Sequence, residues 1–261
     1  MNMNWSRCGV VVGMLGLGLG GGCGGAGGTE GTVAVTRERV MAPLPGESRR
    51  VGGDLAASIS GEDGDYRSGP CRIDTPLPMG YPQPTPPGAI DLKTYPSVRR
   101  AEVRGTGSAD RGMNSAFWPL FNHIQKHDIA MTSPVEMEFG GGAAGAGAAP
   151  GAVSRSDGSG IGQGGEWSMA FLYRSADQNA TGQEGEVVVR DAEPITVVSI
   201  GMKGDYGMKL VERGAEAVEA WLAANPEWEA AGGWRSLYYN GPSIDFWNKW
   251  AEVQMPVRVK E

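Results

Sequence analysis

The C-terminal two thirds of the chain run twice through the same order of predicted elements, and this duplication constrains the fold most strongly. In the first copy, residues 89–105 alternate polar and apolar side chains as two strands broken at Tyr95-Pro96. A helical stripe of apolar residues at spacings of three and four follows over 113–127. Further strands are predicted over 129–139 and 166–174, so the unit is strand–strand–helix–strand–strand.

The second copy repeats this unit. Residues 186–202 are predicted as a strand pair broken at Glu193-Pro194, and 206–225 as an amphipathic helix. Strands over 234–246 and 249–259 complete the copy. Four matches align the two copies: Tyr95-Pro96 with Glu193-Pro194, the Phe117–Ile124 helix with Ala217–Ala224, Pro134 with Pro242, and Trp167 with Trp250.

Two such units give about eight strands and two helices. Closing the strands into a curved sheet removes exposed edges. We therefore expect an α+β fold over residues 88–259, a distorted antiparallel β-barrel of two pseudo-symmetric repeats flanked by two α-helices.

Pro119 is tolerated in a first helical turn, which predicts that the first helix begins near Phe117 or Trp118.

The N-terminus has the pattern of an export signal. Arg7 precedes a Gly-rich apolar run that is short for a membrane span. Cys23 follows small residues and resembles the lipidated Cys of a bacterial lipoprotein, which predicts a signal peptide over 1–23 and a periplasmic or membrane-anchored protein. Cleavage near Gly22 or Ala26, which leaves a soluble periplasmic protein, is the alternative.

Two low-complexity stretches are predicted to lack structure. Residues 24–87 are rich in Gly, Pro and charged residues, which favours a disordered tether. The Gly/Ala-rich residues 140–165 have no G-K-[ST] sequence and predict a flexible insertion rather than a phosphate loop. The net charge of −7 gives no electrostatic support for nucleic-acid binding. The three cysteines form no C-x-x-C pair, so the sequence predicts neither a zinc site nor thioredoxin chemistry.

Four motifs occur in order: DLKTYPSVRRAEV, AFWPLFNHIQ, IAMTSPVEM, and SLYYNGP followed by WNKWAEVQMPV. Together these motifs resemble the SOUL/heme-binding protein family over roughly residues 88–258. The resemblance implies a barrel of two pseudo-symmetric halves and non-catalytic, reversible binding of heme or another tetrapyrrole in an apolar groove near the first helix.

Carried over to this chain, the resemblance places the groove at the helix Phe117–Lys126. The implied ligand-binding residues are Phe117, Trp118, Phe121, His123, Ile124, Lys126, His127 and Met131. The chain departs from the family at Asn122, where a relative has a basic residue, and at Asp245, whose charge would repel a propionate. Lys126, Lys249, Arg99 and Arg100 are candidate substitutes, although none occupies a motif position.

The only two histidines, His123 and His127, share one helix face. His123 is a candidate axial ligand of heme iron, and His127 is a second. The alternative is structural, because a cationic imidazole is favoured at a helix C-terminus. No third ligand for a free metal ion is evident from the sequence. Core packing is the simplest role for Met131 and Met137.

The sequence thus predicts an exported heme- or tetrapyrrole-binding protein that is not an enzyme. No nucleophile with a neighbouring base is evident, and no G-x-S-x-G sequence surrounds Thr132-Ser133. The alternative is a binding module of the same fold for another apolar small molecule or a protein partner, which the missing basic residues favour.

Overall fold

The computed structural model describes residues 41–140, 161 and 165–261 of the chain. The expected signal peptide, the candidate anchor Cys23 and most of the expected insertion at 140–165 lie outside the described residues. Among the described residues no helix has the length and apolar character that crossing a membrane requires.

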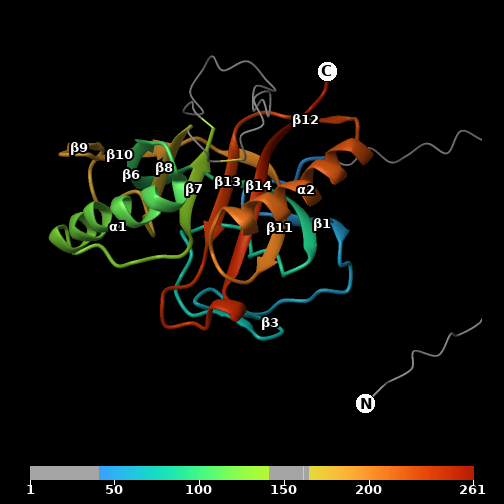
Figure 1. Ribbon diagram of the computed structural model, residues 1–261, viewed down its shortest axis with the longest axis horizontal. Helices are drawn as coiled ribbons and strands as arrows, with labels where there is room; N and C mark the ends of the chain where they lie inside the picture. Colours follow the sequence, from blue (N-terminus) through green and yellow to red (C-terminus); the bar gives the residue numbers. More distant parts are fainter. Residues whose placement is uncertain (1–40, 141–160, 162–164) are drawn as a thin grey trace, which may run out of the picture. The chain divides into compact units, whose positions relative to one another are not determined.

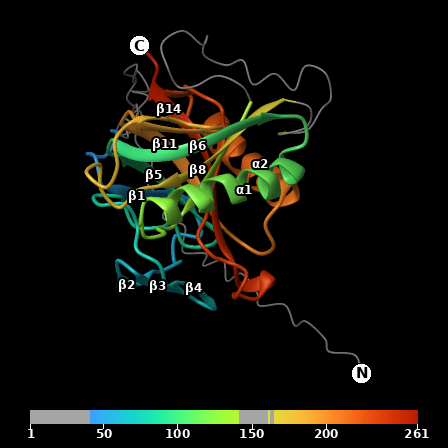
Figure 2. The same cartoon turned by 90° about the vertical axis from the view of Figure 1, so that its left-hand side faces the viewer.

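An antiparallel sheet and two helices build the fold (Figures 1 and 2). Along the sheet the strand order is β1 (Ser48–Gly53), β5 (Ala89–Tyr95), β11 (Ile195–Lys203), β14 (Trp250–Val259), β13 (Trp234–Tyr238), β7 (Val135–Phe139), β8 (Glu166–Leu172), β6 (Val98–Thr106), β10 (Val187–Ala192) and β9 (Gly182–Glu184). The short strand β12 (Trp228–Ala230) pairs with β14. The helices are α1 (Ala109–Lys126) and α2 (Met208–Ala224).

The predicted duplication is confirmed by the order of the elements. The first repeat is β5-β6-α1-β7-β8 and the second is β10-β11-α2-β13-β14. The two repeats meet where β7 pairs with β13, and the strand order reads symmetrically outward from that pair. The first strand of each repeat pairs with the second strand of the other. The antiparallel sheet with two helices is confirmed, and closure into a barrel stays a prediction.

Two of the four matches between the repeats are wrong, whereas the match of Phe117–Ile124 in α1 with Ala217–Ala224 in α2 holds. Pro134 directly precedes β7, whereas Pro242 follows β13, so the two prolines occupy different connections. Trp167 packs against α1, but Trp250 lies on the opposite face of the sheet. Side chains alternate between faces along a strand, so a shift of one residue exchanges the faces. The match of Tyr95-Pro96 with Glu193-Pro194 holds, because both pairs join the first two strands of a repeat.

Helix α1 begins at Ala109, eight residues before Phe117, so the predicted start was wrong. Pro119 therefore lies inside the helix. A proline in a helix leaves the carbonyl four residues earlier without its N–H partner, here the carbonyl of Ser115. Ser115 is exposed, so water can bond to this carbonyl and the helix continues.

The expected tether is wrong for residues 41–87, whereas residues 24–40 lie outside the described residues. In the described part, β1 pairs with β5 at the edge of the sheet. Strands β2 (Ser60–Glu62), β3 (Asp65–Ser68) and β4 (Cys71–Ile73) form a second, three-stranded sheet. Tyr66, Cys71, Ile73 and Leu77 are buried in a core cluster with Trp250. Few apolar residues suffice here because they pack on an existing domain and need no core of their own.

Both helices pack on the same face of the sheet, α1 on β6, β8 and β10, and α2 on β11 and β14. Glycines allow the close approach. A Cβ on Gly112 of α1 would lie 2.1 Å from the Trp167 ring, and one on Gly105 of β6 would lie 2.2 Å from it. A Cβ on Gly214 of α2 would lie 2.6 Å from Val253.

Gly112→Ala is therefore expected to destabilise the protein, although Ala favours a helix by about 1 kcal/mol over Gly. Overpacking costs about 1–3 kcal/mol, and Gly105 on the other side prevents the indole from moving away. Thermal unfolding measures the effect. Gly241→Ala is the control, because nothing lies within 4 Å of that position. A higher Tm for Gly112→Ala than for the wild type would show that the helix and sheet are not in close contact here.

Candidate functional site

Three side chains of α1, Phe117, Trp118 and Phe121, define what we call the aromatic flank. Trp118 is exposed, and the two phenylalanines are partly exposed. The rings of Phe117 and Phe121 stack with centroids 5.7 Å apart. Trp118 meets both edge-on, at 5.6 and 6.1 Å, and is 62% exposed. Phe117 also contacts Phe171 of β8 at 5.4 Å, which attaches the flank to the sheet. The flank therefore presents flat apolar surface to solvent.

The two histidines lie in a separate cluster with Glu184 of β9. His123 Nδ1 lies 3.2 Å and His127 Nε2 lies 2.8 Å from the same carboxylate oxygen, Oε2. Lys126 donates to the other oxygen, Oε1. His123 Nε2 bonds to the hydroxyl of the buried Tyr173 at 2.8 Å. Burial, and then the neighbouring His127, lower the pKa of His123, which favours a neutral imidazole.

Helix geometry separates this cluster from the aromatic flank. At about 100° per residue, Phe121 lies about 40° from Phe117 around the helix axis, whereas His123 lies about 120° from Phe117. His123 is only 5% exposed. Both of its ring nitrogens are hydrogen-bonded, so bonding to iron would require breaking one of these bonds.

The remaining predicted ligand-binding residues fall in neither group. Ile124 is 4% exposed and packs among the buried residues of α1, so it does not line the surface. Met131 lies in the connection from α1 to β7 and is 36% exposed, so its predicted role in core packing is wrong. Met137 of β7 is fully buried, in agreement with its predicted core role. The structure therefore brings Phe117, Trp118 and Phe121 together, and His123, His127 and Lys126 together, as two groups.

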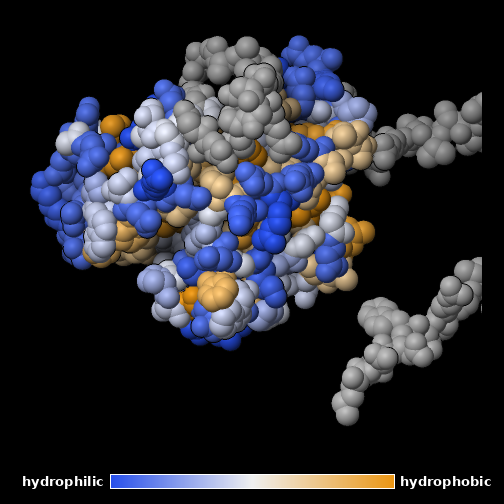
Figure 3. Space-filling model, in the orientation of Figure 1, coloured by the Kyte–Doolittle hydropathy of each residue, from blue (hydrophilic) through white to orange (hydrophobic). Residues whose placement is uncertain are grey.

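A third candidate ligand, which is not evident from the sequence, lies beside the two histidines. Glu184 brings a carboxylate oxygen to them, and one nitrogen of each histidine and this oxygen lie within 4.8 Å of one another. Figure 1 shows the C-terminal end of α1 and β9 together at the left, an end that is mainly hydrophilic in Figure 3. Local spacing gives no signal for Glu184, because it is 57 residues from His127 and reaches it only through the fold.

The sheet face opposite the helices carries charged side chains, and we call it the polar face. Arg100 pairs there with Glu102 at 2.8 Å, with Glu138 at 3.0 Å and with Glu136. Arg235 reaches the second oxygen of Glu136 at 2.5 Å. Arg100, Glu102 and Glu136 are each at most 3% exposed. These ion pairs connect the two repeats across β6, β7 and β13.

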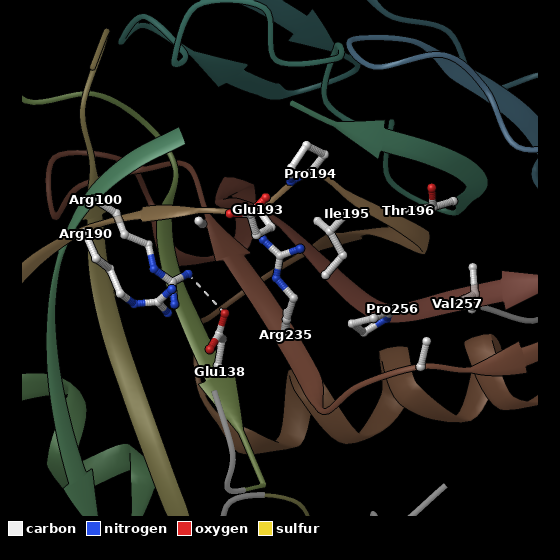
Figure 4. A pocket seen from close by; sticks show the side chains of 12 residues that line it. Arg100, Glu138, Arg190, Glu193, Pro194, Ile195, Thr196, Arg235, Pro256 and Val257 are labelled. Atoms are coloured by element: carbon white, nitrogen blue, oxygen red, sulfur yellow. Dashed lines mark hydrogen bonds and ion pairs between the residues drawn. The ribbon is translucent and has the colours of Figure 1, made fainter. Parts of the chain in front are cut away.

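A cavity of about 280 Å³ opens beside these ion pairs. Figure 4 shows Arg100 and Arg190 reaching toward Glu138 from one side, with Arg235 on the other. The apolar walls of the cavity include Ile195 and Pro256. Nε and Nη1 of Arg235 have no hydrogen-bond partner within the described residues.

Burial alone would raise the pKa of Glu138, but Arg100, with a smaller effect from Arg235, lowers this pKa to about 2. A carboxyl group whose pKa is lower in the folded than in the unfolded protein stabilises the fold at pH values above its unfolded pKa, about 4.5. This stabilisation is lost as the pH falls toward 2. We expect Glu138→Gln to lower the free energy of unfolding most above pH 5, and progressively less toward pH 3. Urea unfolding of both proteins at several pH values measures this. A difference independent of pH would contradict the ion-pair account.

A second buried network centres on Glu252 of β14. Its carboxylate accepts hydrogen bonds from Lys93 Nζ at 2.8 and 3.0 Å, and from the hydroxyls of Ser199 at 2.5 Å and Tyr239 at 2.7 Å. Gln254 Nε2 and the backbone N–H of Thr85 also donate to it. Lys93 and Glu252 are both fully buried. These donors surround the Glu252 carboxylate, although Oε1 of Gln254 has no hydrogen-bond partner within the described residues.

The proline-rich residues 76–88 cover this network rather than acting as a spacer. Tyr81 packs on Tyr95 with ring centroids 4.8 Å apart. The carbonyl of Thr85 accepts a hydrogen bond from Trp250 Nε1 at 2.8 Å. Gly201 allows the contact, because a Cβ there would lie 2.1 Å from the carbonyl oxygen of Pro86.

The Thr132-Ser133 hydroxyls have structural partners. Thr132 donates to the carbonyl of Leu172, and Ser133 donates to that of Thr75 at 3.0 Å. Both hydroxyls therefore bond to backbone carbonyls of neighbouring segments at the residues just before Pro134.

The four candidate basic substitutes are each engaged elsewhere. Arg99 pairs with Asp191 at 2.8 Å, and Arg100 is buried among glutamates. Lys249 lies 4.9 Å above the Tyr206 ring, and Lys126 pairs with Glu184. Arg111, which the sequence reading missed, is exposed and lies seven residues before Trp118 in α1. Seven residues make about two turns, so Arg111 lies on the same side of the helix, about 10 Å from Trp118.

Two repeats on one antiparallel sheet, with two helices on one face, define a two-repeat α+β protein. The model of the SOUL heme-binding protein family matches residues 83–256, which is more than half of the chain. The chain belongs to this family, which suggests heme or tetrapyrrole binding, and whose members are generally non-catalytic binding proteins.

The fold is similar to that of the EcmrR C-terminal domain, with a TM-score of 0.50 and 15% identity over 66% of this chain and 98% of that one. The EcmrR chain in a DNA complex within EcmrR-RPo gives the same TM-score and identity, and the chain spans 57% of its length. At this identity the likeness concerns the fold alone. No curated protein sequence is significantly similar to the chain.

Proposed function

We propose that the protein binds heme or another tetrapyrrole on the aromatic flank of α1, without catalytic turnover. The observation that carries the proposal is the exposure of Trp118 beside the stacked Phe117 and Phe121. Flat aromatic surface suits a flat macrocycle, and its burial supplies most of the affinity. Family membership supports the class of ligand.

The carboxylates of such a ligand need cations. Arg111 lies on the same side of α1 as Trp118 and is exposed, so it is our candidate for one propionate. A bond from the iron to His123 forms no part of the proposal, because His123 is buried on another side of the helix. Burial of the macrocycle, rather than ligation, would then determine the affinity.

Titration of the full chain with hemin tests this, with the Soret band as the readout. Iron-free protoporphyrin, followed by its fluorescence, is the matched ligand. We expect saturable binding of both, with dissociation constants within about fivefold, which is about 1 kcal/mol. No saturable change with either ligand would overturn the proposal. Binding of hemin alone would show that ligation dominates.

The second candidate is a binding module for another apolar small molecule or a protein partner. It is favoured because the four basic residues considered for the propionates are engaged elsewhere. A thermal-shift comparison of amphipathic ligands with and without carboxylates separates the two. Stabilisation by uncharged ligands but not by porphyrins would favour this candidate.

We also propose that the protein is exported and anchored through Cys23. The basis is the order of Arg7, an apolar run and Cys23 after small residues. Incorporation of radiolabelled palmitate into the wild type, and its loss in Cys23→Ala, would support the anchor. Equal labelling of both proteins would exclude Cys23 as the lipidated residue.

A further inference from the structure

The cluster at the C-terminal end of α1 contains three side chains of the kinds that bind transition metals. Imidazole nitrogens and carboxylate oxygens are common ligands of zinc in proteins. His123 and His127 are one helical turn apart, and their ring centroids are separated by 4.6 Å. Glu184 approaches both from β9, with Oε2 nearest to each. Two elements distant in the sequence therefore direct three ligand atoms at one point.

The separations suit one ion. Zinc bonds to nitrogen and oxygen are about 2.0–2.2 Å long, so tetrahedral ligand atoms lie about 3.4 Å apart. The three atoms here lie within 4.8 Å of one another, with contacts of 2.8 and 3.2 Å between the carboxylate and each imidazole. Small rotations of His127 and Glu184, which are both partly exposed, suffice to place an ion between them.

Tyr173 supplies a second and independent observation. It is fully buried, and its hydroxyl lies 2.8 Å from Nε2 of His123. Histidine ligands usually donate their other ring N–H to a fixed partner, which sets the tautomer and the ring orientation. Without an ion, Nδ1–H donates to the Glu184 carboxylate and Nε2 accepts from the Tyr173 hydroxyl. When an ion binds, the proton moves to Nε2, which then donates to Tyr173, and the lone pair on Nδ1 faces the ion.

We propose that His123 Nδ1, His127 Nε2 and Glu184 Oε2 bind a divalent transition-metal ion of the zinc class. This goes beyond tetrapyrrole binding, because the site lies on a different side of α1. Three protein ligands leave a fourth position for water. Lys126 pairs with the other oxygen of Glu184, which keeps Oε1 occupied and weakens the attraction for the cation. The bound ion would join the edge strand β9 to α1.

Isothermal titration of the metal-stripped full chain with zinc chloride tests the proposal. We expect one ion per chain and an increase in Tm that magnesium does not produce, because magnesium prefers oxygen ligands. His127→Ala and Glu184→Gln should each weaken zinc binding by roughly tenfold or more. Loss of a residue that only orients a ligand already costs about tenfold or more in metal affinity, and loss of a ligand should cost at least as much. Glu186→Gln is the matched control, since this exposed carboxylate lies two residues away, outside the cluster.

Absence of saturable binding would overturn the proposal, as would equal affinity of the wild type and Glu184→Gln. Lys126→Ala is a variant expected to keep or strengthen binding, which guards against a general loss of fold. Trp118→Ala should leave zinc binding unchanged, and Glu184→Gln should leave porphyrin binding unchanged. Failure of the metal site and failure of the tetrapyrrole proposal are therefore distinguishable.

Discussion

Replacing Lys93 with methionine is expected to lower the free energy of unfolding by about 3–5 kcal/mol, because the change leaves a buried carboxylate without its cation. Lys93 and Glu252 are both 0% exposed and 2.8 Å apart. Burial alone would raise the pKa of Glu252, but Lys93 and the hydrogen bonds to the carboxylate lower it overall. In Lys93→Met only the remaining hydrogen bonds offset the effect of burial, so we expect the pKa of Glu252 to rise. Urea unfolding at pH 7 measures the loss.

Two controls separate the ion pair from general damage. Lys93→Met combined with Glu252→Leu removes both charges, and we expect it to be more stable than Lys93→Met alone. Arg258→Met breaks an exposed pair with Glu229 and should cost at most about 1 kcal/mol. A Lys93→Met variant as stable as Arg258→Met would show that Glu252 is not held as an ionised group in the core.

The largest expected effect on ligand binding comes from the aromatic flank. We expect Trp118→Ala to raise the dissociation constant for hemin about tenfold, which is about 1.4 kcal/mol. An aromatic pair contributes about 0.5–1.5 kcal/mol in addition to the energy of the surface area that it buries, and the expected loss is of this size. When Phe121→Ala is added to Trp118→Ala, hemin binding should weaken further, because the ring that stacks on Phe117 is also lost. Soret titration of each variant measures the change.

Trp247→Ala is the matched control for this prediction. Trp247 is 54% exposed and meets Phe246 at 4.4 Å on the short 3-10 helix Phe246–Asn248, so the chain has a second exposed aromatic pair. We expect its loss to leave hemin affinity unchanged. Weaker binding by Trp247→Ala together with unchanged binding by Trp118→Ala would place the ligand at that second pair.

The repeat architecture could be predicted because it depends on local patterns. Periods of two and 3.6 residues give the strands and helices, and their order alone defines the duplication. The alignment between the copies failed where it depended on single residues. Pro134 and Trp167 were matched by residue type, but only strand pairing shows which residue of the partner repeat faces the helix.

The polar face could not be located from the sequence, although its signal is present. Charged residues alternate with apolar ones in EVRG, VEMEF and AEVQM, which also describes a strand with one side in water. Residues 76–88 cover Glu252, to which the backbone N–H of Thr85 donates, whereas Glu102 and Glu136 are buried among arginines of the sheet. That segment has the composition of a spacer, so its role depends on contacts that composition does not encode.

The two histidines illustrate the same limit at the candidate site. Their spacing of four residues predicts a shared helix face, and this is confirmed by their ring contact. The sequence could not show that Glu184 and Tyr173 surround them, because β8 and β9 reach the helix only through the sheet.

The most direct test of the central claim compares two double variants in one hemin titration. Trp118→Ala with Phe121→Ala removes most of the aromatic flank, and His123→Ala with His127→Ala removes both imidazoles. We expect at least tenfold weaker binding, about 1.4 kcal/mol, for the aromatic double variant, and a change of less than about threefold for the histidine double variant. The reverse order of effects, with loss of the Soret band in the histidine variant, would contradict this expectation.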